Sequence, residues 1–189
     1  MNKKTLRKEL MNKRDSLSEK EILDHSNSIE KSLFNLPVFK DSKNIFIFVS
    51  YKSEVNTHNI IKYCIENNKN IYVPIVDKET KTMNPSRLRD FSHLEKSYMG
   101  ILEPSKDHIE FANNDLMDLV IVPGLLFDKN GYRVGYGGGF YDKFFASLKT
   151  DVIKLGIGYD FQYTAGNIEH DEFDIPVDYF LSEKKFYIL

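Results

Sequence analysis

NIFIFVS at residues 44–50 and IYVPIV at residues 71–76 are the two stretches that decide the fold. Each is a run rich in β-branched and aromatic residues without polar alternation, which predicts a strand buried on both faces. Residues 57–68 lie between them and carry apolar side chains at helical spacing, and asparagines end that pattern. Two strands joined through a helix by short loops form a βαβ unit, whose strands are parallel.

Two helices are predicted before this unit. Residues 2–14 contain good helix formers and neither glycine nor proline, with Leu6, Leu10 and Leu17 on one face. Ser16 and Ser18 each precede a glutamate by three residues, so either can form the capping box of a second helix over about 19–35. Pro37 is expected to end that helix.

The segments after residue 77 complete the expected sheet. A short meander is expected around 83–88 and a loop through 100–104; strands are predicted at 119–122, 153–159, 179–181 and 186–188, and a helix at 140–148. The predicted architecture is α/β, a mostly parallel sheet with helices on both faces. Residues 1–189 are expected to form one domain.

Composition narrows the class of protein. The chain has 41% hydrophobic and 29% charged residues and a formal net charge of −2, a globular balance without the strongly basic character of a general duplex-DNA binder. The single cysteine, Cys64, makes neither an intrachain disulfide nor a cysteine-based zinc site, and the histidines show no H-x-x-x-H pairing. The beginning, MNKKTLRKEL, lacks the apolar core of a signal peptide, and no apolar run reaches membrane-span length. We expect a soluble, cytoplasmic protein with no membrane or nucleic-acid partner.

A glycine-rich stretch is the strongest functional signal. Five of the ten glycines lie in residues 131–139, after a predicted strand and before a predicted helix. Glycine permits close backbone approach, so that successive N–H groups can converge on an anion, and Arg133 adds a bidentate phosphate donor. The alternative is an elaborate turn. The stretch is not a Walker A motif, because Phe140 stands where G-K-[ST] would continue, and it lacks the third glycine of G-x-G-x-x-G.

Other candidate residues lie outside the glycine stretch. Lys3, Arg7 and Arg14 form a basic stripe on the first helix, which is either a second anion contact or a solvated face. Asp142 follows the glycines and suits either a magnesium ion bound to phosphates or a helix start. Asp178 ends the segment Asp174-Ile-Pro-Val-Asp178, whose residue types by themselves are typical of a surface turn. Tyr51, Glu54 and Asn56 follow the first strand, at the sheet edge where a ligand would lie.

These motifs resemble the 5-formyltetrahydrofolate cyclo-ligase family along essentially the whole chain. The central match is Val122-Pro-Gly-Leu-Leu-Phe-Asp128 with Gly131-x-Arg133-x-Gly135-x-Gly137-x-Gly139-Phe-Tyr141-Asp142. Lys3-x-x-x-Arg7, Ser50-Tyr51-x-x-Glu54-Val55-Asn56-Thr57 and Asp174-Ile-Pro-Val-Asp178 follow the family's order. The resemblance implies a three-layer α/β/α sandwich and the ATP-dependent closure of 5-formyltetrahydrofolate to 5,10-methenyltetrahydrofolate, through an N5-iminium phosphate.

The resemblance also implies roles for particular residues. It implies that Arg133 is catalytic, that Asp142 and Asp178 hold Mg²⁺, and that Tyr51, Glu54, Asn56 and Tyr98 bind the folate. The residues that would line ATP are Lys3, Lys4, Thr5, Leu6, Arg7, Arg133, Val134, Gly135, Tyr136, Gly137, Gly138, Gly139, Phe140 and Tyr141.

The sequence departs from the family pattern at three positions. Gly138 stands where a lysine is frequent, Asn56 where an acid is common, and Phe140 where a tyrosine is frequent. Two other functions stay open. The protein could be a sugar-phosphate isomerase, but that reaction needs an acid/base pair and Glu54 is the single candidate. It could also be a nucleotide- or RNA-binding module without turnover. The expected partners are small molecules, and the expected state is a monomer or weak dimer.

Overall fold

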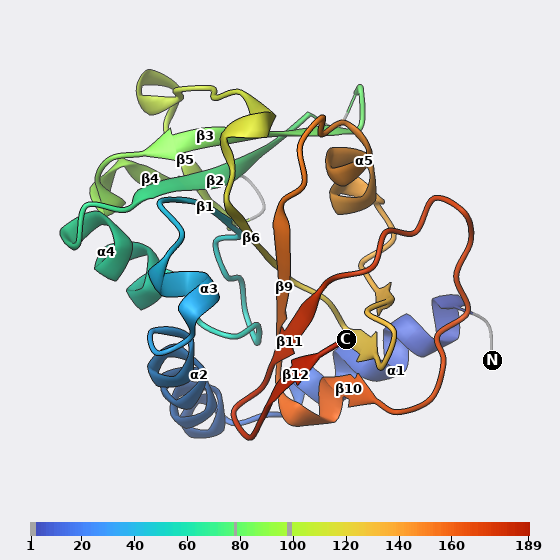
Figure 1. Cartoon of the computed structure of the whole chain (residues 1–189). Helices are drawn as coiled ribbons and strands as arrows, with labels where there is room; N and C mark the ends of the chain where they lie inside the picture. Colours follow the sequence, from blue (N-terminus) through green and yellow to red (C-terminus); the bar gives the residue numbers. More distant parts are fainter. Residues whose placement is uncertain (1–2, 78, 98–99) are drawn as a thin grey trace.

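A seven-stranded sheet runs through the centre of the computed structural model, which describes residues 3–77, 79–97 and 100–189 (Figure 1). In spatial order its strands are β12 (Phe186–Ile188), β11 (Tyr179–Leu181), β9 (Ile153–Ile157), β6 (Leu119–Val122), β1 (Asn44–Ile47), β2 (Asn70–Asp77) and β3 (Thr82–Leu88). The inner strands β11, β9, β6, β1 and β2 run parallel, and the edge strands β12 and β3 pair antiparallel with their neighbours. The predicted mostly parallel sheet is confirmed.

The βαβ unit predicted from the sequence is present as β1, α4 (His58–Glu66) and β2. Ile45 pairs with Ile71 in parallel register, and Ile60, Ile61 and Cys64 of α4 are fully buried. Asn68, just past the helix, has a φ of +58°, a conformation that asparagine tolerates and a helix cannot continue. β1 is shorter than the predicted strand: it ends at Ile47, and Phe48 and Val49 leave the sheet but stay buried.

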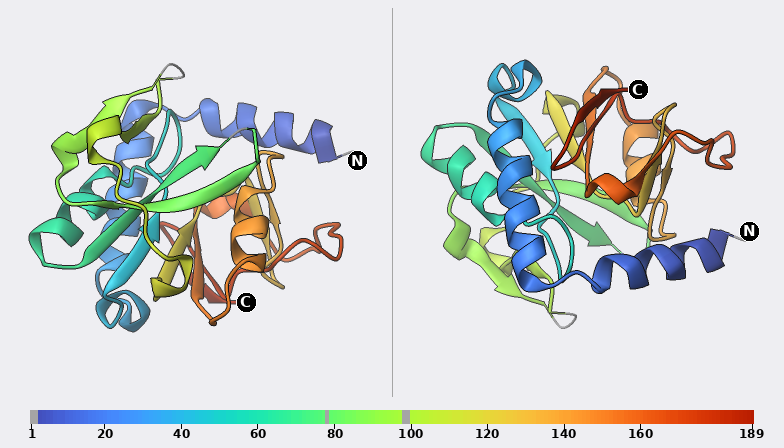
Figure 2. Two further views of the ribbon diagram at one scale, coloured as in Figure 1. Left: turned by 90° about the horizontal axis from the view of Figure 1, so that it is seen from above. Right: turned by 90° about the horizontal axis from the view of Figure 1, so that it is seen from below.

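Helices cover both faces of the sheet (Figure 2). On one face α2 (Glu19–Leu33), α3 (Pro37–Lys40) and α4 pack with Ile45 and Ile47 in the larger apolar cluster. On the other face α5 (Phe140–Ala146) packs against Phe46, whose side chain points the opposite way because side chains alternate along a strand. This is the expected three-layer arrangement.

A small second sheet and α1 (Lys3–Asp15) form a separate apolar cluster. The small sheet consists of β10 (Tyr163–Thr164), β7 (Leu126–Asp128) and β8 (Arg133–Val134). Leu6 and Leu10 of α1 pack against this cluster, as predicted for one helix face. Leu17, predicted on the same face, lies beyond the end of α1 and packs against the larger cluster instead.

Several predicted boundaries are corrected. Of the two candidate capping boxes, Ser18 with Glu21 forms the one that opens α2. Pro37 does not end α2, which already stops at Leu33; it is the first residue of α3, where its missing N–H is not needed.

The expected loop at 100–104 contains β5 (Leu102–Pro104), which pairs with β4 (Leu94–Lys96). The remaining short helices are 3₁₀ turns at Phe91–His93, Lys106–His108, Asn114–Leu116 and Asp160–Gln162.

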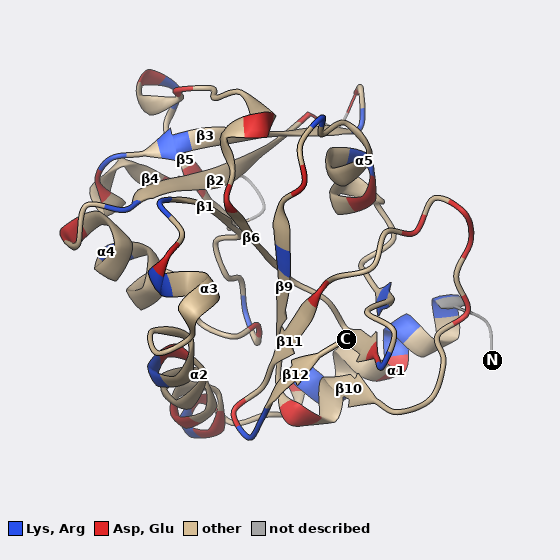
Figure 3. Ribbon diagram, in the orientation of Figure 1, with Lys and Arg blue, Asp and Glu red and all other residues tan. Residues whose placement is uncertain are grey.

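Charged residues of both signs are distributed over the elements (Figure 3). Within the described part of the chain, none of the helices has the length and apolar character needed to cross a membrane.

Candidate functional site

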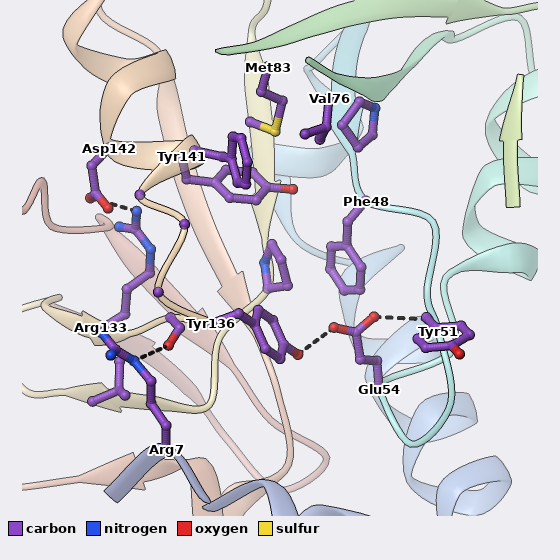
Figure 4. Close-up of a pocket in the computed structure, with 18 of the residues that line it drawn as sticks. Arg7, Phe48, Tyr51, Glu54, Val76, Met83, Arg133, Tyr136, Tyr141 and Asp142 are labelled. Atoms are coloured by element: carbon purple, nitrogen blue, oxygen red, sulfur yellow. Dashed lines mark hydrogen bonds and ion pairs between the residues drawn. The ribbon is translucent and has the colours of Figure 1, made fainter. Parts of the chain in front are cut away.

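A pocket of about 610 Å³ lies beyond the carboxyl ends of the central strands (Figure 4). Phe48 and Val49 after β1, Pro123 after β6, and the second half of β2 form its floor and one wall. The glycine stretch, the start of α5 and Arg7 of α1 form the other wall. This is the position in which open α/β sheets bind ligands.

The glycine stretch adopts backbone conformations that need glycine. Gly137 has a φ of +99°, and the Arg7 guanidinium lies beside it, with Nη1 3.5 Å from where a Cβ would stand. Gly131, at the turn between β7 and β8, has a φ of +85°, and a Cβ there would meet the Val177 carbonyl oxygen at 2.2 Å. Packing against Val177 therefore requires a glycine at position 131, where the stretch begins, whereas Gly135 and Gly137–Gly139 line the pocket.

Arg7 is the residue that ties α1 to the glycine stretch. Its Nε donates to the Gly135 carbonyl at 2.9 Å, which holds the guanidinium at the pocket wall. The other candidates in this helix are placed differently: Leu6 packs in the apolar cluster, and Lys4 and Thr5 are exposed and do not line the pocket. The side chain of Lys3 lies outside the described part of the chain.

Arg133 and Asp142 form a partly buried ion pair at the polar end of the pocket. Arg133 Nη2 donates to Asp142 Oδ1 at 2.7 Å, and Nη1 donates to the Ile175 carbonyl at 2.6 Å; the Arg133 side chain is 6% exposed. Asp142 Oδ1 also accepts from the Ile175 N–H at 3.1 Å. Both bonds of the carboxylate use Oδ1. The pair thus links β8, α5 and the loop before β11.

Glu54 lies across the pocket from this pair (Figure 4). Its Oε2 accepts from the Tyr51 N–H at 2.9 Å and its Oε1 accepts from the Tyr136 hydroxyl. Burial raises the pKa of Glu54, and the hydrogen bonds from Tyr136 and Tyr51 and the charge of Arg14 act in the opposite direction. Burial also raises the pKa of Tyr136 and that of Tyr141, so both phenols stay protonated.

Two further predicted residues, Asn56 and Asp178, are described by the structure and do not line this pocket. Asn56 Oδ1 accepts from the His58 N–H at 2.9 Å and is used at the start of α4. Asp178, the residue before β11, accepts from the Lys154 N–H at 2.7 Å and pairs with Lys154 Nζ at 3.1 Å. Tyr98 lies outside the described residues.

Other pocket residues were not predicted from the sequence. Val76 and Met83 come from β2 and β3, and Ile168, Asp171 and Asp174 come from the loop between β10 and β11. Asp174 belongs to a quoted motif, but local spacing gives no signal for the others, because they meet the glycine stretch only through the tertiary fold.

The fold and pocket define the class first: an α/β protein whose small-molecule site lies beyond the carboxyl ends of parallel strands, with two arginines at its polar side. A sequence model of the 5-formyltetrahydrofolate cyclo-ligase family matches residues 1–183, and the chain therefore belongs to that family.

Named relatives agree with this assignment. The chain is 28% identical over 152 residues to the Haemophilus influenzae 5-formyltetrahydrofolate cyclo-ligase, covering 79% of this chain and 81% of the relative. It is 32% identical over 147 residues to the Mus musculus cyclo-ligase, covering 75% and 72%. The solved structure of Aquifex aeolicus 5,10-methenyltetrahydrofolate synthetase matches with a TM-score of 0.86 at 32% identity, covering 100% of this chain and 93% of that one. The chain is an enzyme of this family, and the family and its relatives support cyclo-ligase activity.

Proposed function

We propose that the pocket converts ATP and 5-formyltetrahydrofolate to 5,10-methenyltetrahydrofolate, ADP and phosphate. The formyl oxygen attacks the γ-phosphorus and ADP leaves, which gives an N5-iminium phosphate. The N10 amine then bonds to the activated carbon and loses its proton, and the carbon–oxygen bond to phosphate breaks. The observation that carries this proposal is the convergence of the glycine stretch, Arg7 and Arg133 on one side of a pocket whose other side is largely apolar.

The polar side suits the triphosphate. Phosphoryl transfer depends mainly on positioning and on charge neutralisation, and backbone amides with two guanidinium groups supply both. Gly138 leaves its position without the cation that the family resemblance implies, and Arg7 lies beside the neighbouring Gly137. The apolar side, with Phe48, Val76 and Met83, suits a flat heterocycle, and Glu54 and Tyr51 can meet its polar edge.

Asp142 fits a magnesium ion that is held mainly by phosphates. Mg²⁺ commonly takes one or two protein carboxylates and completes its shell with phosphate oxygens and water. Asp142 lines the pocket, and its bonds to Arg133 and Ile175 use Oδ1, so Oδ2 would be the ligand atom. Among the described residues no group of three or more His, Cys, Asp or Glu could hold a metal by itself. Bound there, Mg²⁺ would neutralise charge on the phosphates.

The decisive assay uses purified protein with MgATP and 5-formyltetrahydrofolate. We expect the methenyl chromophore to appear with one ADP per product. Calorimetric binding of MgATP without product, at enzyme concentrations well above trace, would instead establish a nucleotide-binding module. That the enzyme acts in the cytoplasm, as a monomer or weak dimer on small molecules alone, stays a prediction.

Arg7→Met is expected to raise the KM for ATP about tenfold, because it removes a guanidinium from the pocket wall; one lost charge-assisted contact is worth about 1.5–3 kcal/mol. The melting temperature should change little, since the side chain's bond to Gly135 is only partly buried. Lys8→Met is the matched control, because exposed Lys8 lies on the same helix and the net charge change is equal. Equal ATP kinetics in both variants would assign Arg7 to the solvated surface.

Asp142→Asn is expected to lower kcat at least about tenfold (roughly 1.4 kcal/mol) and to raise the Mg²⁺ concentration needed for half-maximal rate. The change keeps the shape and removes the charge. Asp178→Asn is the control: because Asp178 pairs with Lys154 and does not line the pocket, we expect its Mg²⁺ titration to follow that of the wild type. A shifted titration for Asp178→Asn, with an unshifted one for Asp142→Asn, would reverse the assignment.

A further inference from the structure

Arg14, part of the basic stripe on α1, does not join Arg7 at the glycine stretch. Its side chain is 7% exposed and lies beneath the opposite side of the pocket. Arg14 Nε donates to Ser53 Oγ at 3.1 Å, and Nη1 donates to the Tyr136 hydroxyl. The same Nη1 lies 3.8 Å from Glu54 Oε1. A charged side chain this deeply buried needs such partners.

The bonds around Tyr136 have a fixed direction. An arginine donates hydrogen bonds and accepts none, so the Tyr136 oxygen must accept from Arg14 and its proton must go elsewhere. That proton is donated to Glu54 Oε1. Glu54 then accepts on both oxygens, since Oε2 takes the Tyr51 N–H at 2.9 Å. Two accepting oxygens are the pattern of an ionised carboxylate.

The chain of bonds joins three segments that are far apart in sequence. Arg14 belongs to the last turn of α1, Glu54 to the loop after β1, and Tyr136 to the glycine stretch. Tyr159 adds a further tie, because its hydroxyl donates to the Ser53 carbonyl at 3.1 Å. Arg14 therefore acts on the pocket from outside its lining.

We propose that Arg14 is a positioning residue for the folate side of the pocket: through the Tyr136 hydroxyl it holds Glu54 as an oriented, ionised carboxylate. The proposal rests on the proposed function, in which Glu54 contacts the folate substrate. It also assigns Tyr136 of the glycine stretch to the Glu54 side as well as to the nucleotide side.

The expected pH effect follows from the groups that face Glu54. These are Arg14 from α1, Tyr136 from the glycine stretch, Tyr141 from α5 and Tyr159 before the last 3₁₀ turn. The three tyrosine hydroxyls are neutral near pH 7, so among these four groups Arg14 is the one whose charge favours an ionised Glu54. Burial already raises the pKa of Glu54. Removing Arg14 should raise it further, and a larger fraction of Glu54 would then be protonated at low pH.

The first test is the pH dependence of kcat/KM for 5-formyltetrahydrofolate in Arg14→Met. We expect the acidic limb to move up by about one pH unit, with activity recovering at higher pH, and the KM for ATP to stay within about twofold of wild type. Arg14→Lys should restore most of the limb, because it restores the charge. Lys13→Met, an exposed neighbour with the same charge loss, should leave the profile unchanged.

The second test does not depend on turnover or on the Arg14 variant alone. In protein labelled with ¹³C at the glutamate carboxyl, the Glu54 resonance is assigned by its loss in Glu54→Gln and titrated in wild type, Arg14→Met and Tyr136→Phe. We expect a higher Glu54 midpoint in both variants. An unchanged midpoint would overturn the proposal even if the enzyme is fully active. If the wild type forms no methenyl product, the proposed function fails, and this titration still decides the role of Arg14.

Discussion

Arg133→Lys is expected to lower kcat at least about 100-fold while the protein stays folded. Lysine keeps the positive charge but has no planar fork, so it does not reproduce the fixed geometry in which Arg133 donates to Asp142 and to the Ile175 carbonyl at 2.7 and 2.6 Å. A pre-positioned donor aimed at developing charge is worth about 10²–10³ in kcat. The measurement is the initial rate of methenyl formation at saturating substrates, with circular dichroism as the check of folding.

Arg87→Lys is the matched control for this variant. Arg87 is also partly buried and donates to Asn70 Oδ1 at 2.6 Å, but it lies on the edge strand β3 and does not line the pocket. We expect its kcat to stay within about twofold of wild type. If the two lysine variants have equal kcat, Arg133 acts only in holding the fold, and its catalytic role is wrong.

Asp128→Ala is expected to lower the free energy of unfolding by at least about 3 kcal/mol. Asp128 is fully buried, and its carboxylate accepts three backbone N–H groups: those of Asn130 at 2.9 Å, Tyr132 at 3.0 Å and Ile168 at 2.8 Å. Each buried donor left without an acceptor costs about 1–3 kcal/mol, against a total stability of about 5–15 kcal/mol. Urea denaturation followed by circular dichroism measures the loss.

Asp118 provides the comparison for Asp128. It accepts the N–H groups of Lys43 and Asn44 at 2.9 and 2.7 Å, but it is exposed, so water can replace it in an alanine variant. We expect Asp118→Ala to lose less than half as much stability as Asp128→Ala. Similar losses in the two variants would mean that burial does not set the cost.

Asp128→Ala should also weaken ATP binding. The carboxylate joins the β7–β8 turn, from which the glycine stretch continues, to the loop that carries Ile168 and Asp171 at the pocket. Loosening this junction would free the glycine stretch and the loop that carries Asp171, which both line the pocket. The residue types around Asp128 would equally suit an ordinary exposed turn. The buried role of Asp128 becomes visible only when distant segments pack around it.

Predictions from sequence succeeded where local patterns carry the information. The runs around Ile45 and Ile71 can be buried only as inner strands, so the parallel βαβ unit follows from them. Ser18 and Glu21 mark the start of α2, and the glycine run marks the pocket wall. Short elements such as β7, β8 and β10 were not predicted, because each is two or three residues long and is stabilised by pairing with distant segments.

The amino-acid sequence by itself determined the fold class, the family resemblance and the glycine and arginine side of the pocket, because hydrophobic periodicity and backbone permissiveness are properties of neighbouring residues. Only the tertiary structure separated Arg7, which lies at the glycine stretch, from Arg14, which lies beside Glu54. It also separated Asp142 in the pocket from Asp178 beside Lys154. The physical reason is that a charged side chain is held by whichever partners surround it, and those partners come from segments that meet only when the sheet and its covering helices are assembled.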